Sequence, residues 1–113
     1  MPDSLPIDID VRSVKQMQDS GEKFVLLDCR EPNEVATAKI AGSVHIAMRQ
    51  IPGRLAELEP HKDARIVVHC HHGGRSLRVT QFLRQQGFGQ VQNMAGGIDA
   101  WSVEVDQAVP RYE

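Results

Sequence analysis

Short apolar runs alternate along this chain with segments in which apolar residues recur at helical spacing. The runs at 24–28 and 66–68 are almost continuous in aliphatic and aromatic residues, which is typical of strands buried on both faces. Further strands are predicted at 5–9, 44–46 and 90–94. The alternation predicts an α/β domain with a mostly parallel central sheet and helices on both faces.

Capping residues and glycines place the helices between these strands. Asp10 is a good N-cap for a helix that ends at Gly21, and Pro32 suits the first turn of the next helix. Ser76 is interpreted as the cap of a later helix, which Gly87 ends. The spacing of apolar residues predicts helices at 49–58, with a break at 52–53, at 76–86 and at 98–103.

The composition is that of an ordinary folded protein. The chain has 113 residues, of which 41% are hydrophobic and 25% charged, and this predicts one domain spanning 1–113. A net charge of −2 argues against a general nucleic-acid binder. No apolar run approaches the roughly 20 residues needed to span a membrane, and the first residues lack the pattern of a signal peptide. We therefore expect a cytoplasmic protein with no membrane or nucleic-acid partner.

The cysteines argue against a disulfide scaffold and against a structural metal. There are two of them, Cys29 and Cys70, and neither belongs to a CxxC pair. Metal binding by the run 69–72 is an alternative, but contiguous ligands on one loop do not easily converge on one ion. We predict no metal site and no cofactor.

The most informative stretch is the loop that follows the run at 66–68. Cys70 opens this loop at the carboxyl end of a predicted strand, where ligands bind in open parallel sheets. Gly73 and Gly74 allow a tight turn, so that backbone amides before the next helix can stabilise an anionic sulfur. A thiol in such a place ionises readily and reacts as a thiolate.

The neighbours of Cys70 favour a reactive thiol over an inert buried one. An inert thiol is the alternative, since free cysteine is often simply buried. Arg75, however, supplies a planar fork of donors that suits an oxyanion. His71 and His72 add hydrogen-bond donors or, as the pH falls, positive charge.

Four segments, in order along the chain, resemble the motifs of single-domain rhodaneses, which are sulfurtransferases. The segment 27–34 resembles the family's D-x-R-x-x-x-E motif, and 38–43 is similar to its G-H-I-P-G-A run. The loop 70–75 resembles the six-residue active loop, which starts with cysteine and often ends in arginine, and 96–101 resembles the G-G-x-x-x-W signature. The resemblance covers nearly the whole chain and implies a rhodanese-like five-stranded parallel sheet flanked by helices.

The resemblance also implies a mechanism. The Cys70 thiolate would take the outer sulfur of a small-molecule donor such as thiosulfate, and the resulting persulfide would pass it to cyanide or a thiol. A thioredoxin-like or other sulfur-acceptor protein is a further expected partner. The sequence thus predicts Cys70 as the catalytic residue, with substrate-binding and supporting residues around it. The substrate-binding residues are His71, His72, Gly73, Gly74 and Arg75, and the supporting residues are Asp28 and Ser76.

Two features bear on the choice among functions. Thiosulfate-preferring members often have arginine directly after the cysteine, whereas this chain has His71, so the donor stays open. Related phosphatases need a loop one residue longer, and the four residues between Cys70 and Arg75 favour sulfur over phosphate or arsenate. A module that only carries sulfur or docks a protein is the alternative to an enzyme.

Several other residues near the predicted site have two interpretations. Asp28 either bonds to the loop backbone or orders the next turn, and the second is favoured. Arg30 and Glu34 are expected to form a structural ion pair. Cys29 either reacts with Cys70 or is packed and inert, and His69 is expected to be a satisfied core histidine. The segment 109–112 is expected to dock on the domain.

Overall fold

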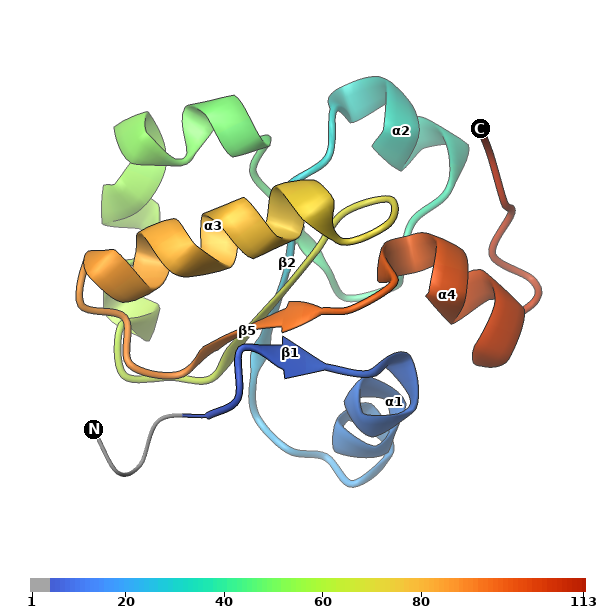
Figure 1. The fold of residues 1–113 in the computed structure, drawn as a ribbon, viewed down its shortest axis with the longest axis horizontal. Coiled ribbons are helices and arrows are strands. Elements are labelled where there is room, and N and C mark those ends of the chain that lie inside the picture. The colour runs from blue at the N-terminus through green and yellow to red at the C-terminus, as the bar shows by residue number, and fades with distance from the viewer. Residues whose placement is uncertain (1–4) are drawn as a thin grey trace.

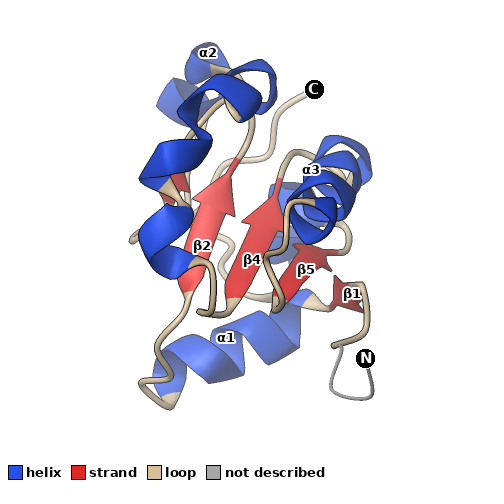
Figure 2. Cartoon of the chain, turned by 90° about the vertical axis from the view of Figure 1, so that its left-hand side faces the viewer, coloured by secondary structure: helices blue, strands red, loops and turns tan. Residues whose placement is uncertain are grey.

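A computed structural model describes residues 5–113 as a single five-stranded parallel sheet with helices on both faces (Figures 1 and 2). The sheet order is β1-β5-β4-β2-β3, and every pairing is parallel. The strands are β1 (Asp8–Ile9), β2 (Val25–Asp28), β3 (Val44–His45), β4 (Ile66–His69) and β5 (Val91–Met94). The predicted fold class is therefore confirmed. Residues 1–4, on which the prediction of no signal peptide partly rests, lie outside the described residues.

Helices cover the two faces and bury separate hydrophobic clusters. The α-helices are α1 (Val11–Asp19), α2 (Pro32–Thr37), α3 (Gly74–Gln85) and α4 (Gly97–Glu104). Three 3-10 helices lie between β3 and β4: η1 (Met48–Gln50), η2 (Pro52–Glu57) and η3 (Glu59–His61). Val68 in β4 points into the cluster beneath α3, whereas its neighbour Val67 points into the cluster of α1 and α4. This alternation explains why the first three residues of the central strand, Ile66 to Val68, are all apolar.

The helix starts predicted from Asp10 and Pro32 are confirmed. The Asp10 carboxylate accepts a hydrogen bond from the Ser13 amide at 2.7 Å, which satisfies a free donor in the first turn of α1. Glu31 precedes α2, and Pro32 is its first residue. Glu34 completes a reciprocal capping box, since its side chain accepts from the Glu31 amide at 3.0 Å.

Three predicted elements differ from those observed. The first strand covers only Asp8–Ile9, because Pro6 has no amide hydrogen to donate to a neighbouring strand. The helix predicted at 49–58 is a series of 3-10 turns, and Arg54 in the middle has a non-helical φ of −115°. The helix predicted to begin at Ser76 begins at Gly74, so Ser76 is not its cap.

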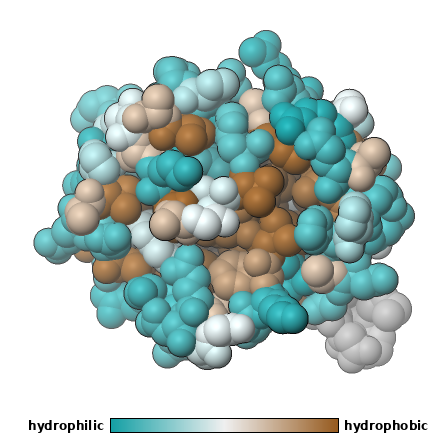
Figure 3. Space-filling view, turned by 180° about the vertical axis from the view of Figure 1, so that it is seen from behind, coloured by the Kyte–Doolittle hydropathy of each residue, from teal (hydrophilic) through white to brown (hydrophobic). Residues whose placement is uncertain are grey.

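The surface is mostly hydrophilic. Figure 3 shows a smaller apolar area near the middle of the face opposite to that in Figure 1, with hydrophilic residues around it. The exposed large apolar side chains of the described residues are Val44, on the edge strand β3, and Val103 in α4. Within residues 5–113, no helix has the length and apolar character to cross a bilayer.

Candidate active site

The Cys70 loop lies at the carboxyl edge of the sheet, between the central strand β4 and helix α3. Gly73 ends the loop with a φ of +114°, a conformation that L side chains rarely adopt, and this brings the amides of the first turn of α3 back over the cysteine. The Gly73 amide lies 3.1 Å from the Cys70 Sγ, and the Ser76 amide lies 3.4 Å from it. The Ser76 hydroxyl lies 3.3 Å from the same sulfur. The loop thus surrounds one sulfur with several donors.

These donors govern the ionisation of Cys70. Burial, which leaves the residue 1% exposed, raises the pKa of the thiol. Hydrogen bonds from the Ser76 hydroxyl and from the amides of Ser76, Gly73 and Arg75 act in the opposite direction and outweigh burial. The net result is a pKa below the ordinary value of a cysteine, which favours the reactive thiolate.

The start of α4 fixes the loop from the other side. The Ile98 amide donates to the Cys70 carbonyl at 2.9 Å, and the Asp99 amide donates to the His71 carbonyl at 3.1 Å. A Cβ at Gly97 would lie 2.5 Å from both of these carbonyl oxygens, so only glycine allows the approach. The glycine pair at 96–97 therefore holds the Cys70 loop in place.

The Arg75 guanidinium forms an ion pair with Glu34 beside the Cys70 loop. Its two terminal nitrogens donate to the two Glu34 carboxylate oxygens at 2.7 and 2.8 Å. The hydrogen bonds from Arg75 are the largest cause that lowers the pKa of Glu34, which falls to about 2. The pair links the first turn of α3 to α2, and the predicted Arg30–Glu34 ion pair is wrong. Arg30 reaches only the backbone carbonyl of Glu34, at 3.3 Å.

Asp28 and Arg30 form a fully buried ion pair below the site. The Arg30 guanidinium donates to both Asp28 carboxylate oxygens, at 2.9 and 2.7 Å, and both side chains are 0% exposed. Asp28 also accepts from the Arg30 amide at 3.0 Å, which orders the turn after β2. Burial raises the pKa of Asp28, but the hydrogen bonds from Arg30 outweigh it and lower the pKa overall. Asp28 therefore has the structural role that was favoured.

The C-terminal segment docks on the domain, as expected for 109–112, and packs against the Cys70 loop. The Tyr112 ring stacks on the His71 ring with centroids 4.0 Å apart and planes at 9°. The Tyr112 hydroxyl accepts from Arg30 at 2.9 Å and donates to Glu34 at 2.9 Å. Arg111 is held by two hydrogen bonds to Asp99, at 2.9 and 3.2 Å. Through Tyr112, the C-terminal segment thus connects the Cys70 loop to the Asp28–Arg30 pair and to the Arg75–Glu34 pair.

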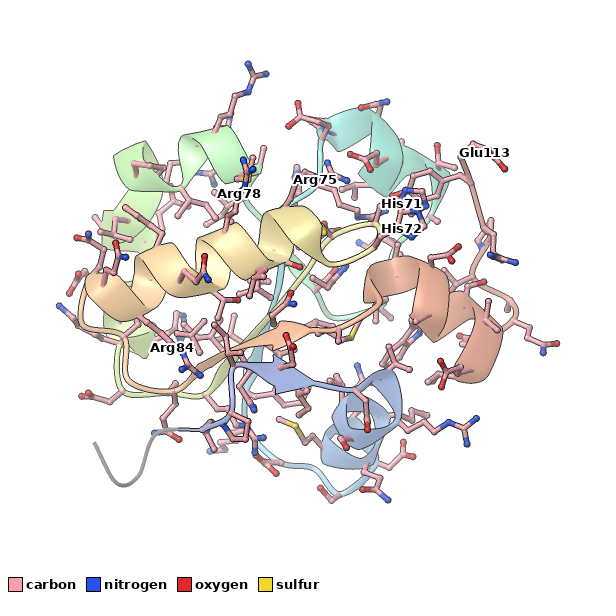
Figure 4. The ribbon with its side chains drawn as sticks, in the orientation of Figure 1. His71, His72, Arg75, Arg78, Arg84 and Glu113 are labelled. Atoms are coloured by element: carbon pink, nitrogen blue, oxygen red, sulfur yellow. The ribbon has the colours of Figure 1, made fainter. Side chains whose placement is uncertain are left out.

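A hollow of about 490 Å³ opens between the Cys70 loop and the C-terminal segment. Figure 4 shows His71 and His72 on the loop before α3, on the side nearest the end of the chain at Glu113. His72 is exposed, whereas His71 is partly covered and its Nε2 atom is buried. The lining residues are His71, His72, Asp99, Arg111, Tyr112 and Glu113.

Tyr112 is expected to stabilise the fold through both its hydroxyl and its ring. Tyr112→Phe removes the two hydrogen bonds but keeps the stacking on His71, and should lower the free energy of unfolding by about 1 kcal/mol. Tyr112→Ala also removes the ring and should lower the free energy of unfolding by about 1 kcal/mol more than Tyr112→Phe does. Urea denaturation measures both values. Equal stability of Tyr112→Phe and the wild type would show that the hydroxyl contributes nothing.

His69 differs from the satisfied core histidine that was expected. It is 0% exposed, and neither ring nitrogen has a hydrogen-bond partner within the described part of the chain. Burial is the main reason that its pKa is lowered to about 4, although the negative charge of Asp28, 4.0 Å away, acts in the opposite direction. His69 is therefore neutral in the folded protein near neutral pH.

The buried His69 predicts a loss of stability in mild acid. Between the ordinary pKa of about 6.5 and the folded value of about 4, the unfolded chain binds a proton that the folded chain does not. The free energy of unfolding should therefore fall as the pH decreases through this window. In His69→Leu this component should be absent, so urea denaturation between these pH values should show a flatter dependence. Parallel curves for the two proteins would contradict the expectation.

Cys29 lies at the end of β2 and has the features of a packed, inert thiol. It is 0% exposed, and its sulfur lies 3.5 Å from the His69 carbonyl, to which it donates. Burial is the main cause that raises the pKa of Cys29 to about 12, and the nearby Cys70 adds to the effect. Both cysteines are free, and redox chemistry between them stays a hypothesis.

The structure brings most of the predicted site residues together and adds others. Gly73 and Ser76 donate hydrogen bonds to the Cys70 sulfur, and Gly74 is the first residue of α3. Arg75 is bound by Glu34, a partner that the sequence did not identify. Asn93, in β5, was missed, because a single asparagine in a short strand gives no local signal. Its Oδ1 lies 2.5 Å from the Ser76 hydroxyl. Within residues 5–113, no group of three or more potential ligands could hold a metal ion.

Comparisons with known proteins agree with the geometry. The family model described as the rhodanese-like domain matches residues 10–104. A sulfurtransferase of Allochromatium vinosum is 38% identical over 95 residues, which cover 84% of this chain and 87% of that protein. The chloroplastic rhodanese-like/PpiC domain-containing protein 12 of Arabidopsis thaliana is 41% identical over 91 residues, or 77% of this chain. The match spans only 30% of that longer protein.

Solved structures show the same fold. The crystal structure of a rhodanese-related protein from Thermoplasma volcanium has a TM-score of 0.78 and 29% identity, covering 88% of this chain and 94% of that one. Two relatives from Bacillus subtilis are called a putative sulfurtransferase and a putative sulfur carrier protein. The loop that opens at Cys70 therefore lies in a rhodanese-like domain, and this chain belongs to the rhodanese family, whose members include sulfurtransferases.

Proposed function

We propose that this protein is a sulfurtransferase that carries sulfane sulfur on Cys70 as a persulfide. The observation that carries the proposal is the set of donors around one sulfur. The Gly73 amide, the Ser76 amide and the Ser76 hydroxyl all lie 3.1–3.4 Å from the Cys70 Sγ. The two amides are fixed by the fold, so they stabilise an anionic sulfur without reorganising during the reaction. The names of the relatives, sulfurtransferase and sulfur carrier, support the same chemistry.

The proposed reaction has two displacement steps. The Cys70 thiolate attacks the outer sulfur of thiosulfate, a new S–S bond forms, and the donor's S–S bond breaks so that sulfite leaves with the electron pair. The acceptor, cyanide or a thiol, then attacks the outer sulfur of the persulfide. The bond to Cys70 breaks, and the thiolate is restored with its electron pair. No external oxidant or reductant is needed.

The other predicted site residues are proposed to admit, bind and orient the reactants in these two steps. The hollow beside His71 and His72 is the proposed entrance for the donor and for a small acceptor. Gly73 and Gly74 keep the loop tight enough for its amides to face the sulfur, and Arg75 is proposed to bind the sulfonate end of the donor. A thioredoxin-like or other sulfur-acceptor protein, a cytoplasmic location and the absence of a cofactor stay predictions.

Arg75 and Glu34 offer a matched pair of variants that test the proposed donor contact. Arg75→Ala should slow persulfide formation from thiosulfate about tenfold, which corresponds to about 1.4 kcal/mol. Glu34→Gln breaks the charge pair but keeps the guanidinium, so the rate should stay within about twofold of the wild type. Stopped-flow or quenched mass measurements give both rates. Equal losses in the two variants would mean that Arg75 acts only by joining α3 to α2.

The experiment that tests the proposed function is mass spectrometry of the intact protein after incubation with donors. Thiosulfate, 3-mercaptopyruvate and a low-molecular-weight persulfide are offered separately. His71 stands where thiosulfate-preferring members often have arginine, so the sequence does not identify the donor. A gain of one sulfur on Cys70, lost again on adding cyanide or a thiol, is expected. If the sulfur is gained but neither acceptor removes it, the chain is a carrier module rather than an enzyme. No gain with any donor overturns the proposal.

A further inference from the structure

The Ser76 hydroxyl lies among three acceptors but has one proton to give. Its oxygen is 3.3 Å from the Cys70 Sγ, 3.2 Å from the Gly73 carbonyl oxygen and 2.5 Å from the Asn93 Oδ1. A hydroxyl can donate to only one of these at a time. Ser76 is 0% exposed and Asn93 is 3% exposed, so solvent cannot easily replace a lost partner. The sulfur and the amide oxygen therefore share one donor.

The Asn93 amide cannot turn to avoid this conflict. Its Nδ2 atom donates to the Asp8 carboxylate at 3.0 Å, and a carboxylate only accepts hydrogen bonds. The Asn93 backbone is also fixed, because its amide donates to the Ile7 carbonyl at 2.7 Å beside the first strand. Asp8, on the neighbouring strand β1, thus keeps the Asn93 oxygen directed at Ser76.

We propose that Asn93 is a positioning residue that competes with the Cys70 sulfur for the hydroxyl proton of Ser76, and that Asp8 holds it in this orientation. When Cys70 is a thiol, the hydroxyl donates to Asn93. When the thiol loses its proton to solvent, the sulfur becomes an anion and the hydroxyl turns towards it. The Asn93 oxygen then remains buried without a donor. The free thiolate therefore carries a cost that the thiol does not.

This competition has a consequence for sulfur transfer, which rests on the proposed function. In a Cys70 persulfide the negative charge lies on the outer sulfur, and the inner sulfur is no longer an anion. The Ser76 hydroxyl can then return to Asn93. The cost present in the thiolate is relieved in the persulfide, so Asn93 favours the sulfur-loaded form over the free thiolate.

Other titratable groups lie near Cys70, of which Cys29 and Arg75 interact with its charge, and they must stay constant in a test. Cys29 and the Asp28–Arg30 pair lie at the end of β2, and the Arg75–Glu34 pair joins α3 and α2. Asp8 lies behind Asn93 and is exposed. The variants below change none of these groups except Asp8, for which a neutral control exists.

The test is the pH dependence of Cys70 alkylation by iodoacetamide, with the modified peptide identified by mass. Asn93→Leu removes the competing oxygen at similar volume and should lower the measured pKa of Cys70 by about one unit, or tenfold in thiolate at acidic pH. In a Ser76→Ala background the same change should have no further effect, because the shared donor is gone. An unchanged or raised pKa in Asn93→Leu would overturn the proposal.

Asp8 provides a second, milder pair of variants in case Asn93→Leu does not fold. Asp8→Asn removes the charge but keeps an oxygen that can accept from Asn93, whereas Asp8→Ala removes both. Asp8→Ala frees the amide to turn its nitrogen towards Ser76, and should lower the Cys70 pKa below that of Asp8→Asn. Equal values would show that the orientation of Asn93 has no effect. Alkylation does not require persulfide formation, so failure of the proposed function leaves this result interpretable.

Discussion

Replacing Cys70 by serine is expected to reduce sulfur transfer to the uncatalysed level, a loss on the order of a thousandfold or more. Serine fits the same buried space, and its hydroxyl can still meet the amides of Gly73 and Ser76. An alcohol oxygen, however, is not ionised at neutral pH and forms no persulfide. The variant should therefore keep the stability of the wild type while sulfite release from thiosulfate, measured in the presence of cyanide, disappears.

Cys29→Ser is the matched control for this loss. Cys29 is fully buried, and its raised pKa of about 12 leaves almost no thiolate at neutral pH. Transfer by this variant should stay within about twofold of the wild type. Activity that persists in Cys70→Ser, or that disappears in Cys29→Ser, would contradict the assignment of Cys70 as the nucleophile.

Arg30→Met is expected to lower the free energy of unfolding by about 3–5 kcal/mol. The change leaves the Asp28 carboxylate buried at 0% exposure without its guanidinium partner. It also removes the donors to the Ala38 carbonyl, at 2.7 Å, and to the Tyr112 hydroxyl, at 2.9 Å. An uncompensated buried charge costs far more than the loss of one surface pair. Urea denaturation at neutral pH measures the effect.

The double variant Asp28→Leu with Arg30→Met distinguishes an unpaired charge from lost packing. Removing both charges leaves no buried ion, so much of the stability lost in the single variant should return. The comparison is a double-mutant cycle measured under the same conditions. A double variant as unstable as Arg30→Met would show that the size and shape of Arg30, rather than the charge of Asp28, dominate.

The parts of the fold that the sequence predicts are those that local patterns determine. The continuous apolar runs of β2 and β4 predict buried parallel strands, and Asp10 predicts the start of α1. The position of Cys70 at the end of β4 follows from the same pattern. The Cys70 loop is likewise short enough for its two glycines and its arginine to indicate the chemistry that we propose.

The parts that the sequence does not predict depend on contacts between distant segments. Glu34 is 41 residues from Arg75 and 78 residues from Tyr112, so the nearer Arg30 was the obvious but wrong partner for its carboxylate. The sequence predicts Ser76 as a helix cap, whereas the positive φ of Gly73 starts the helix earlier and turns the Ser76 hydroxyl towards the sulfur. Side-chain partners of this kind follow from the sheet order, which short motifs do not specify.

The site combines backbone amides in fixed positions with an arginine whose charge is neutralised by an ion pair. The amides of Gly73 and Ser76 are directed at the sulfur by the start of α3, while the carboxylate of Glu34 neutralises the guanidinium of Arg75. The sulfur is therefore stabilised chiefly by hydrogen bonds and by the start of α3 rather than by a free cation. Such a site suits a sulfur anion that must be held and then released.

The most direct measurement is the mass of Cys70 itself. The protein is incubated with a sulfur donor, excess donor is removed, and the peptide that contains Cys70 is analysed without reduction. We expect the wild-type peptide to gain one sulfur, the Cys70→Ser peptide to gain none, and the gain to disappear after treatment with cyanide. A wild-type protein that gains no sulfur from any donor, or gains it on Cys29 instead, would contradict the assignment of Cys70 as the sulfur carrier.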